Sequence, residues 1–254
     1  MAYAVFFDLD GTLTDYGRMV EHTMATLAER VAARAKVDAA RFKVVYNAVQ
    51  AEDETSQRAG GLTVTELRDR RRRFGRTLEC LGIHDAALVE ELSAAYAEAR
   101  RTTCFSLPGA EATLRLLKDR GVWVAIVTEG SGQEQRGQID RLGWTSLLDD
   151  LVISEELGLH KPEPALVAAA LTRARLEAQQ AVFVGDRALW DLQPAKRLGM
   201  TTVLFVTSLY REEAEAGAAF IDARVESHDE LQEWLTHWLE PATSTDSRRS
   251  RHQP

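Results

Sequence analysis

Short apolar runs, each followed directly by a small or acidic residue, recur along this chain. They cover residues 3–7, 124–127, 151–153, 181–184 and 201–206. Apolar runs this short, bounded by polar turns, are typical of strands that a parallel sheet buries on both faces. Amphipathic patterns between them predict helices over residues 110–120, 133–142, 162–176, 189–198 and 229–239. Strands that alternate with helices in this way predict an α/β fold, a parallel sheet flanked by helices.

The alternation is interrupted once, directly after the first strand. Between residues 14 and 104 the apolar positions recur at spacings of three and four, which is typical of amphipathic helices packed on one another. Thr63-Val64-Thr65-Glu66 has the sequence of a capping box and begins one of these helices. The four predicted apolar stripes are Val20–Val31, Phe42–Val49, Leu67–Leu81 and Leu88–Ala99. We therefore expect a helical unit of residues 15–104, inserted into a core of residues 1–14 and 105–240.

Composition narrows the class of protein. The 254 residues carry a formal net charge of −8, which disfavours a nucleic-acid partner. Cys80 and Cys104 have neither metal-site nor disulfide spacing. No stretch approaches the ~20 apolar residues of a membrane span, and the first apolar run lacks a basic flank. We expect a cytoplasmic protein without membrane contact and of unknown oligomeric state. Residues 241–254, rich in Ser, Thr and Arg, are predicted to form a disordered tail.

The candidate chemistry lies just past the ends of the predicted strands. Asp8 and Asp10 follow the first strand and point the same way, and Asp186 follows a later one. Like charges this close need a shared proton or a cation, and a hard cation such as Mg²⁺ prefers oxygen ligands. A carboxylate is also a nucleophile that can form an acyl-phosphate. Thr128 and the two amides after it are phosphate donors, and Lys161 is a cation able to hold both phosphate and nucleophile.

In their order along the chain, these residues are similar to the motifs of a known family. Asp8-Leu9-Asp10-Gly11-Thr12, then Thr128, Lys161 before a helix, and Gly185-Asp186 with Asp191 beyond it resemble the haloacid-dehalogenase-like (HAD) hydrolase superfamily. The inserted helices resemble the cap of its C1 class, and the chain short of its tail resembles the phosphoglycolate phosphatase-like members. This resemblance implies a Rossmann-like core and an all-helical C1 cap domain that closes over the site.

The resemblance also implies a role for each matched residue. Asp8 would be the nucleophile that becomes aspartyl-phosphate, and Asp10 the general acid and then the base for water. Asp8, Asp186 and the backbone carbonyl of Asp10 would hold Mg²⁺, and Thr128 and Lys161 would hold the phosphate. The dehalogenases of the superfamily generally lack an acid at the second position, so Asp10 favours phosphoryl chemistry over dehalogenation.

Two positions depart from the usual family pattern. Glu129, grouped here with the phosphate-binding residues, stands where Asn is common, and Arg187 stands where a small hydroxyl residue is usual. A carboxylate at position 129 repels a phosphate unless it is paired or turned away. We hypothesise that Glu129 and Arg187 form a salt bridge at the rim of the crevice; the alternative is that both face water. Asp191 is expected to orient Lys161 or a metal-bound water.

The third helical stripe carries a run of arginines between Arg68 and Arg76, most of which we interpret as a solvated face. Arg71 differs, because its spacing from Leu67 and to Phe74 places it on the apolar stripe. It either packs there with its charge paired or reaches the cleft and binds an anionic substrate group beyond the scissile phosphate. Tyr16, Arg18 and His22, just past the catalytic loop, are further candidates for substrate contacts.

The sequence therefore predicts a Mg²⁺-dependent phosphatase that hydrolyses a small phosphorylated metabolite through an aspartyl-phosphate intermediate. A phosphomutase of the β-phosphoglucomutase type shares all four motifs and differs only in the lifetime of its phosphoenzyme. A catalytically idle HAD-like binding subunit is an alternative from another class, but it has no need of the nucleophile Asp8. A dehalogenase is the third alternative.

Overall fold

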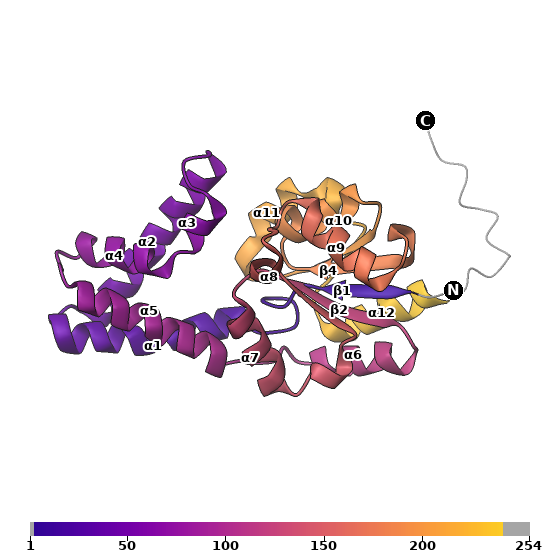
Figure 1. The fold of residues 1–254 in the computed structure, drawn as a ribbon, viewed down its shortest axis with the longest axis horizontal. Helices are drawn as coiled ribbons and strands as arrows, with labels where there is room; N and C mark the ends of the chain where they lie inside the picture. Colours follow the sequence, from indigo (N-terminus) through magenta and orange to yellow (C-terminus); the bar gives the residue numbers. More distant parts are fainter. Residues whose placement is uncertain (1–2, 241–254) are drawn as a thin grey trace.

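The computed structural model of this protein describes residues 3–240, and its core is a six-stranded sheet (Figure 1). All neighbouring strands are parallel, in the order β3-β2-β1-β4-β5-β6. The strands are β1 (Ala4–Phe7), β2 (Trp123–Thr128), β3 (Asp150–Ile153), β4 (Ala181–Gly185), β5 (Thr201–Phe205) and β6 (Ala223–Val225). The predicted α/β fold is confirmed. The sequence did not predict β6, because three residues are too few to show a periodicity.

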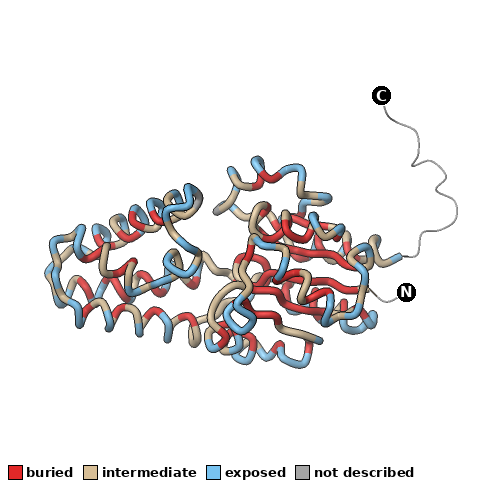
Figure 2. The backbone as a smooth tube through the Cα atoms, turned by 45° about the horizontal axis from the view of Figure 1, so that its top comes forward, coloured by how far each residue is buried: buried red, intermediate tan, exposed pale blue. Residues whose placement is uncertain are grey.

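The helices around the sheet are α6 (Ala110–Asp119), α7 (Gly132–Leu142), α8 (Ser154–Leu157), α9 (Pro164–Ala174), α10 (Gln193–Arg197), α11 (Arg211–Ala216) and α12 (His228–Leu239). Val5 and Phe7 of β1 pack with side chains of α6 and α12 in one apolar cluster. Ala4 and Phe6 point to the opposite face and pack with α9 in a second cluster. Helices therefore cover both faces, which is why β1 and β4 at the centre of the sheet are buried along their whole length (red in Figure 2).

Two predicted helices begin differently from the prediction. The helix expected from residue 162 begins at Pro164, because that proline takes the first helical position, where its missing N–H is not needed. The helix expected over residues 189–198 begins as a π-helical segment, Ala188–Leu192, and continues as α10. In this segment the amides of Asp191 and Leu192 both donate to the carbonyl of Arg187. The segment follows β4 directly and carries Asp191 toward the carboxyl edge of the sheet.

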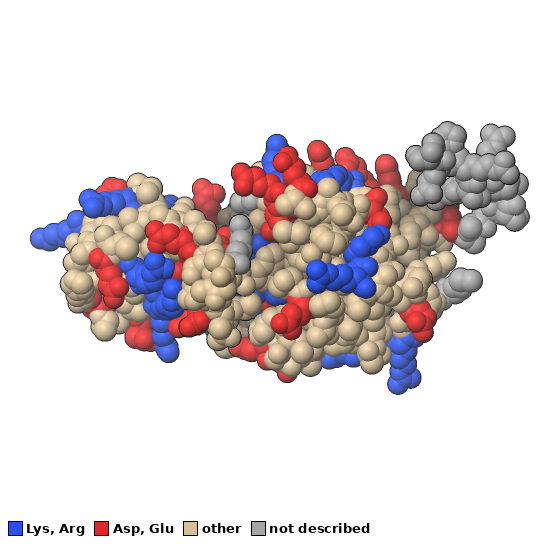
Figure 3. Space-filling model, turned by 90° about the horizontal axis from the view of Figure 1, so that it is seen from above, with Lys and Arg blue, Asp and Glu red and all other residues tan. Residues whose placement is uncertain are grey.

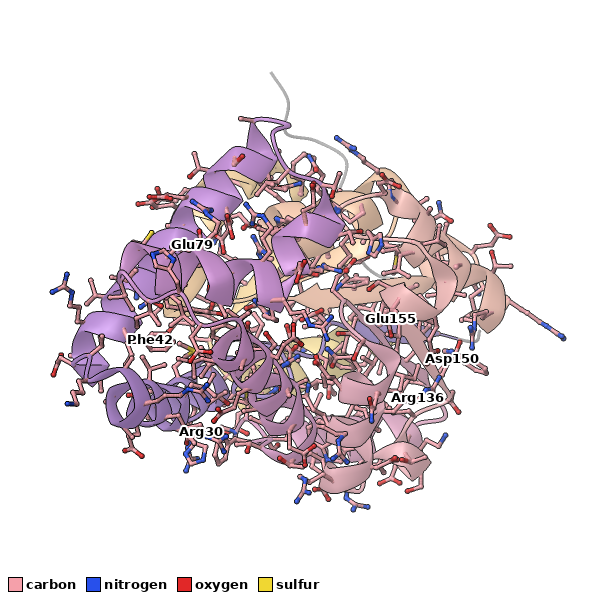
Figure 4. The ribbon with its side chains drawn as sticks, turned by 60° about the vertical axis from the view of Figure 1, so that its left-hand side comes forward. Arg30, Phe42, Glu79, Arg136, Asp150 and Glu155 are labelled. Carbon is pink, nitrogen blue, oxygen red and sulfur yellow. The ribbon has the colours of Figure 1, made fainter. Side chains whose placement is uncertain are left out.

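Five further helices form a unit with an apolar core of its own, which we call the cap: α1 (Tyr16–Ala35), α2 (Ala39–Arg58), α3 (Val64–Arg68), α4 (Arg70–Cys80) and α5 (Ala86–Thr102). Phe42 is fully buried in that core, and Figure 4 labels it among the cap helices. The predicted capping box is present, since the side chains of Thr63 and Glu66 each accept from the other's backbone amide.

The third predicted helix consists of two helices, α3 and α4, that meet at Asp69. The backbone of Asp69 is extended (φ −66°, ψ 101°), which ends α3. Its carboxylate accepts a hydrogen bond from the amide of Arg72, which caps the start of α4. An Asp within a run of arginines thus breaks a stripe that the apolar spacing alone predicted to be continuous.

The cap meets the core chiefly where α5 packs against α7. Because the cap and the sheet have separate apolar clusters, they support the predicted division into core and cap, which stays a prediction. On the face shown in Figure 3, acidic and basic side chains are interspersed over both units. Among residues 3–240, no helix is both long and apolar enough to cross a membrane. The predicted tail, residues 241–254, lies outside the described residues.

Candidate active site

The carboxyl ends of three adjacent strands form the floor of a cavity between the core and the cap. β2, β1 and β4 are neighbours in the sheet, and they lead to Thr128, Asp8 and Asp186, respectively. Parallel strands align their carboxyl ends at one edge, so residues far apart in the sequence meet there. The cavity has a volume of about 660 Å³. Of the predicted residues, its lining contains Asp8, Asp10, Thr128, Glu129, Lys161, Asp186 and Asp191.

Lys161 lies between two carboxylates at the base of the cavity. Its Nζ is 2.7 Å from Oδ1 of Asp8 and 2.6 Å from Oδ1 of Asp191, and the side chain is only 2 % exposed. Burial disfavours the ammonium charge, but Asp191 and Asp8 more than offset this effect and raise the pKa of Lys161. Lys161 is therefore a fixed cation whose position is set by both carboxylates.

Three carboxylates crowd this end of the sheet. Oxygens of Asp8, Asp186 and Asp191 lie within 4.8 Å of one another. Burial, with Asp191 nearby, raises the pKa of Asp8 to about 7 although Lys161 opposes the shift; burial, with Asp191 and Asp8, also raises the pKa of Asp186. Oδ2 of Asp186 is buried without a hydrogen-bond partner among residues 3–240. Gly11 (φ +91°) passes so close that a Cβ there would lie 2.2 Å from this oxygen.

These observations fit a divalent cation. An orphaned carboxylate oxygen and two raised pKa values are what crowded, buried acids show when a positive charge is missing from the group. The carboxylate that joins Asp8 and Asp186 in the cluster is that of Asp191, whereas the carboxylate of Asp10 points elsewhere. Any contribution of Asp10 would therefore come from its backbone carbonyl, as the sequence analysis expected.

The carboxylate of Asp10 is held by an arginine of the cap. Nη2 of Arg100 lies 2.5 Å from Oδ2 of Asp10, and Nη1 lies 3.3 Å from Oδ1. Arg100 is 5 % exposed, and its Nε is also 3.6 Å from Glu134 of α7. Two parallel contacts of this kind fix both the position and the plane of a carboxylate. The cap thus orients the residue that the family resemblance makes the general acid.

Arg100 was not among the predicted site residues, although the sequence contains a signal for it. The buried residues of α5 are Leu88, Leu92, Tyr96 and Arg100, which recur every four positions. Residues four apart lie on one face of a helix, so the row points Arg100 toward the interior. An arginine that ends an apolar row at the junction with the core needs a buried partner.

Glu129 pairs with the cap rather than with Arg187. Its carboxylate forms an ion pair with Arg68 of α3 and accepts a hydrogen bond from the amide of Lys161. Arg187 instead donates to Glu213 of α11 at 2.9 Å. The guanidinium of Arg187 also stacks on Trp190 and Tyr210. The predicted Glu129–Arg187 salt bridge is therefore wrong, and so is its alternative, because neither residue simply faces water.

We expect a double-mutant cycle to detect the Arg68–Glu129 pair. Arg68→Gln and Glu129→Gln should show a coupling of about 1 kcal/mol in the free energy of unfolding, measured in urea, because both side chains are largely buried. Glu129→Gln combined with Arg187→Gln is the control and should couple by less than about 0.5 kcal/mol. Equal couplings in the two cycles would contradict this assignment.

The predicted phosphate donors after β2 are only partly free. Thr128 is 1 % exposed, and its hydroxyl makes a 3.4 Å contact with the carbonyl of Glu129. The amide of Gly130, expected to donate to phosphate, donates to Oγ of Ser154 at 3.1 Å. That expectation for Gly130 is wrong in this structure, because β3 delivers Ser154 beside the end of β2.

Of the predicted substrate contacts outside the motifs, Tyr16 lines the cavity, whereas Arg71, Arg18 and His22 do not. Arg71 is exposed and forms an ion pair with Glu90 at 2.9 Å. The spacing from Leu67 predicted that Arg71 lies on the apolar stripe, but Leu67 belongs to α3 and Arg71 to α4, so that spacing does not place them on one helix face. Arg18 is exposed and stacks on Phe105, 4.0 Å from the ring centroid. The cavity is lined instead by other arginines of the cap, among them Arg68, Arg70, Arg73 and Arg100, so the solvated face predicted for most of the arginine run is wrong for the first three.

Comparison with known proteins agrees with the fold and with the family that the sequence resembles. Residues 3–199 match the haloacid dehalogenase-like hydrolases. The chain is similar to the glyceraldehyde 3-phosphate phosphatase of Methanocaldococcus jannaschii (28 % identity over 217 residues, 84 % of this chain and 88 % of that protein). It is also similar to the ribulose-1,5-bisphosphate 5-phosphatase of Halopiger xanaduensis (33 % over 218 residues, 85 % and 88 %). Its fold is similar to that of magnesium-bound YfnB from Bacillus subtilis (TM-score 0.73, 19 % identity, 92 % and 99 %). With most of its length matched, this chain belongs to the haloacid dehalogenase-like hydrolases.

Proposed function

We propose that this protein is a Mg²⁺-dependent phosphatase that hydrolyses a small phosphate monoester through an aspartyl-phosphate on Asp8. The observation that carries the proposal is the pair of Asp8 and Lys161 at the floor of the cavity. A carboxylate in contact with a buried ammonium group is suited to attack a phosphoryl group, since the same cation can hold the phosphate beside it. Covalent transfer to Asp8 divides one slow hydrolysis into two faster steps.

The neighbouring residues supply the other parts of the reaction. Lys161 stabilises the negative charge of the phosphoryl group, and Asp191 holds Lys161 in place. Asp10 protonates the leaving oxygen and then takes a proton from the water that hydrolyses the aspartyl-phosphate. Thr128 lies beside this position at the end of β2, where its hydroxyl can turn toward a phosphate oxygen.

The carboxylates of Asp8 and Asp186, with the backbone carbonyl of Asp10, would hold Mg²⁺, and Asp191 lies next to them. When bound, Mg²⁺ would offset the charge of these carboxylates and of the phosphoryl group. The orphaned oxygen of Asp186 supports this assignment.

Small sugar phosphates are the proposed class of substrate. The two relatives described above are named for activity on glyceraldehyde 3-phosphate and on ribulose-1,5-bisphosphate. A cavity of about 660 Å³ is within the usual range of small-molecule sites, roughly 300–1,000 Å³.

Phosphate release tests the proposal. We expect the protein to release inorganic phosphate from at least one small sugar phosphate in the presence of Mg²⁺ and to lose this activity when EDTA removes the metal. A colorimetric phosphate assay over a panel of esters measures it. Conversion of one sugar phosphate isomer to another without release of phosphate would instead identify a phosphomutase. A folded, Mg²⁺-binding protein without either activity would support the idle binding subunit.

A further inference from the structure

Arg70 is the first residue of α4 and lines the cavity from the cap side. Four other arginines line the same cavity, and each has a carboxylate partner: Arg68 with Glu129, Arg73 with Asp53, Arg100 with Asp10, and Arg187 with Glu213. Arg70 differs from these four, because no carboxylate among residues 3–240 forms an ion pair with it. Its charge therefore faces the cavity without a counter-ion from the described part of the chain.

The side chain of Arg70 is held in place without that counter-ion. Its guanidinium lies over the ring of Tyr96, 4.6 Å from the centroid, and Tyr96 is only 3 % exposed. A planar guanidinium stacked on an aromatic ring keeps its N–H groups free at the edge for an oxyanion. Because Tyr96 is fixed by the cap core, the position of Arg70 is set before a ligand binds.

The position of Arg70 follows from the helix that carries it. The buried face of α4 contains Arg73, Phe74, Thr77 and Leu78. Arg70 lies three and four residues before the first two of these, so it lies on the same face, whereas Arg71 lies at its flank and pairs with Glu90 on the surface. The break at Asp69 thus decides that Arg70, and not Arg71, faces the cavity.

A second cation stands near Arg70. Arg100 and Arg70 come from different cap helices, both line the cavity, and their like charges repel each other. The charges of Arg100 and Arg70 both act to lower the pKa of Glu134, but the carboxylate of Glu134 contacts only Arg100, at 3.6 Å. Like charges in a partly desolvated cavity are costly unless an anion joins them.

We propose that Arg70 binds a second anionic group of the substrate, at the end away from the phosphate that Asp8 attacks. The inference rests on the proposed function and narrows its substrate class to phosphate esters that carry a further carboxylate or phosphate group. Both groups present the planar or forked oxygens that a guanidinium binds in a bidentate manner. The phosphate to be hydrolysed would then lie at the floor of the cavity beside Asp8, and the second anionic group would lie at the cap side beside Arg70.

Matched pairs of substrates test this inference. 3-Phosphoglycerate and glyceraldehyde 3-phosphate differ by a carboxylate in place of an aldehyde, and ribulose-1,5-bisphosphate and ribulose 5-phosphate differ by the second phosphate. We expect the wild-type kcat/KM to be higher for the more anionic member of at least one pair. Arg70→Met should lower kcat/KM for that member by about 10- to 100-fold and for its partner by less than about 3-fold. The pair in which the more anionic member is preferred tells whether the second group is a carboxylate or a phosphate.

Arg71→Met is the matched control, because it removes the neighbouring arginine from an exposed position. It should leave the preference within either pair unchanged. If Arg70→Met does not fold, Arg70→Lys replaces it; it keeps the charge, loses the bidentate geometry and should reduce the preference about 3- to 10-fold.

The outcomes separate the inference from the proposed function. A purely structural role of Arg70 would lower kcat/KM equally for both members of a pair and would overturn the inference. Phosphate release without any preference for the more anionic esters would overturn it as well, while the phosphatase proposal stands. No release from any of the four esters would count against the proposed function and would remove the inference with it.

Discussion

Asp8→Asn should reduce phosphate release by at least about 10,000-fold, because it removes the nucleophile on which the covalent step depends. Asn has nearly the same size and shape as Asp, and Asp8 is 7 % exposed at the end of a buried strand. The substitution therefore removes a charge without opening a cavity. Release of phosphate in the presence of Mg²⁺ is the measurement, with circular dichroism to show that the fold persists.

Asp119→Asn is the control for this result. Asp119 is an exposed residue at the end of α6 and does not line the cavity, and its replacement should leave the rate within about 2-fold. A folded Asp8→Asn protein that keeps a tenth or more of the wild-type rate would exclude Asp8 as the nucleophile. Since alkaline workup releases phosphate from an acyl-phosphate, a wild-type protein quenched during turnover should also yield protein-bound labile phosphate, up to one per active site.

Lys161→Met should destabilise the protein by about 3–5 kcal/mol in the free energy of unfolding at pH 8 and should abolish measurable activity. Met keeps most of the volume but removes the ammonium group that lies between Asp8 and Asp191. Two buried carboxylates then lose their shared counter-ion, which is the costly form of breaking a buried ion pair. Urea unfolding in EDTA measures the loss without a contribution from a bound metal.

The pH dependence of this loss has a definite sign. Burial raises the pKa of folded Asp8 to about 7 from its ordinary value of 3.8, so its stabilising contribution is present below about pH 4 and is lost as the pH rises through 7. Lys161 opposes that rise in pKa, so its removal raises the value further. The destabilisation by Lys161→Met should therefore be larger at pH 8 than at pH 5.

Lys118→Met is the matched control, because Lys118 pairs with Asp149 at 2.7 Å on the surface. An exposed pair contributes about 0–1 kcal/mol, so this variant should lose little stability at either pH. If the two variants lost equal stability, or if the loss by Lys161→Met were larger at pH 5 than at pH 8, the assigned role of Lys161 would be wrong.

Residues that follow directly from a strand were predictable from the sequence. Asp8 and Asp186 each come at the end of a short apolar run, and parallel strands bring such ends to one edge. The spacing of apolar residues predicts which side of a helix a residue faces, but only as long as the helix is not interrupted. Arg71 was chosen over Arg70 because the spacing from Leu67 was carried across Asp69, where the helix breaks.

The sequence by itself determined the parallel α/β core, the inserted helices and the acidic and basic residues at the carboxyl edge, because local periodicity specifies strands, helices and their ends. Tertiary structure alone decided which charge pairs with which. Arg100 reaches Asp10 across 90 positions, and Glu129 pairs with Arg68 of the cap rather than with Arg187. Such partners are set by how the cap packs over the core. The spacing of residues within one helix or strand does not specify this long-range arrangement.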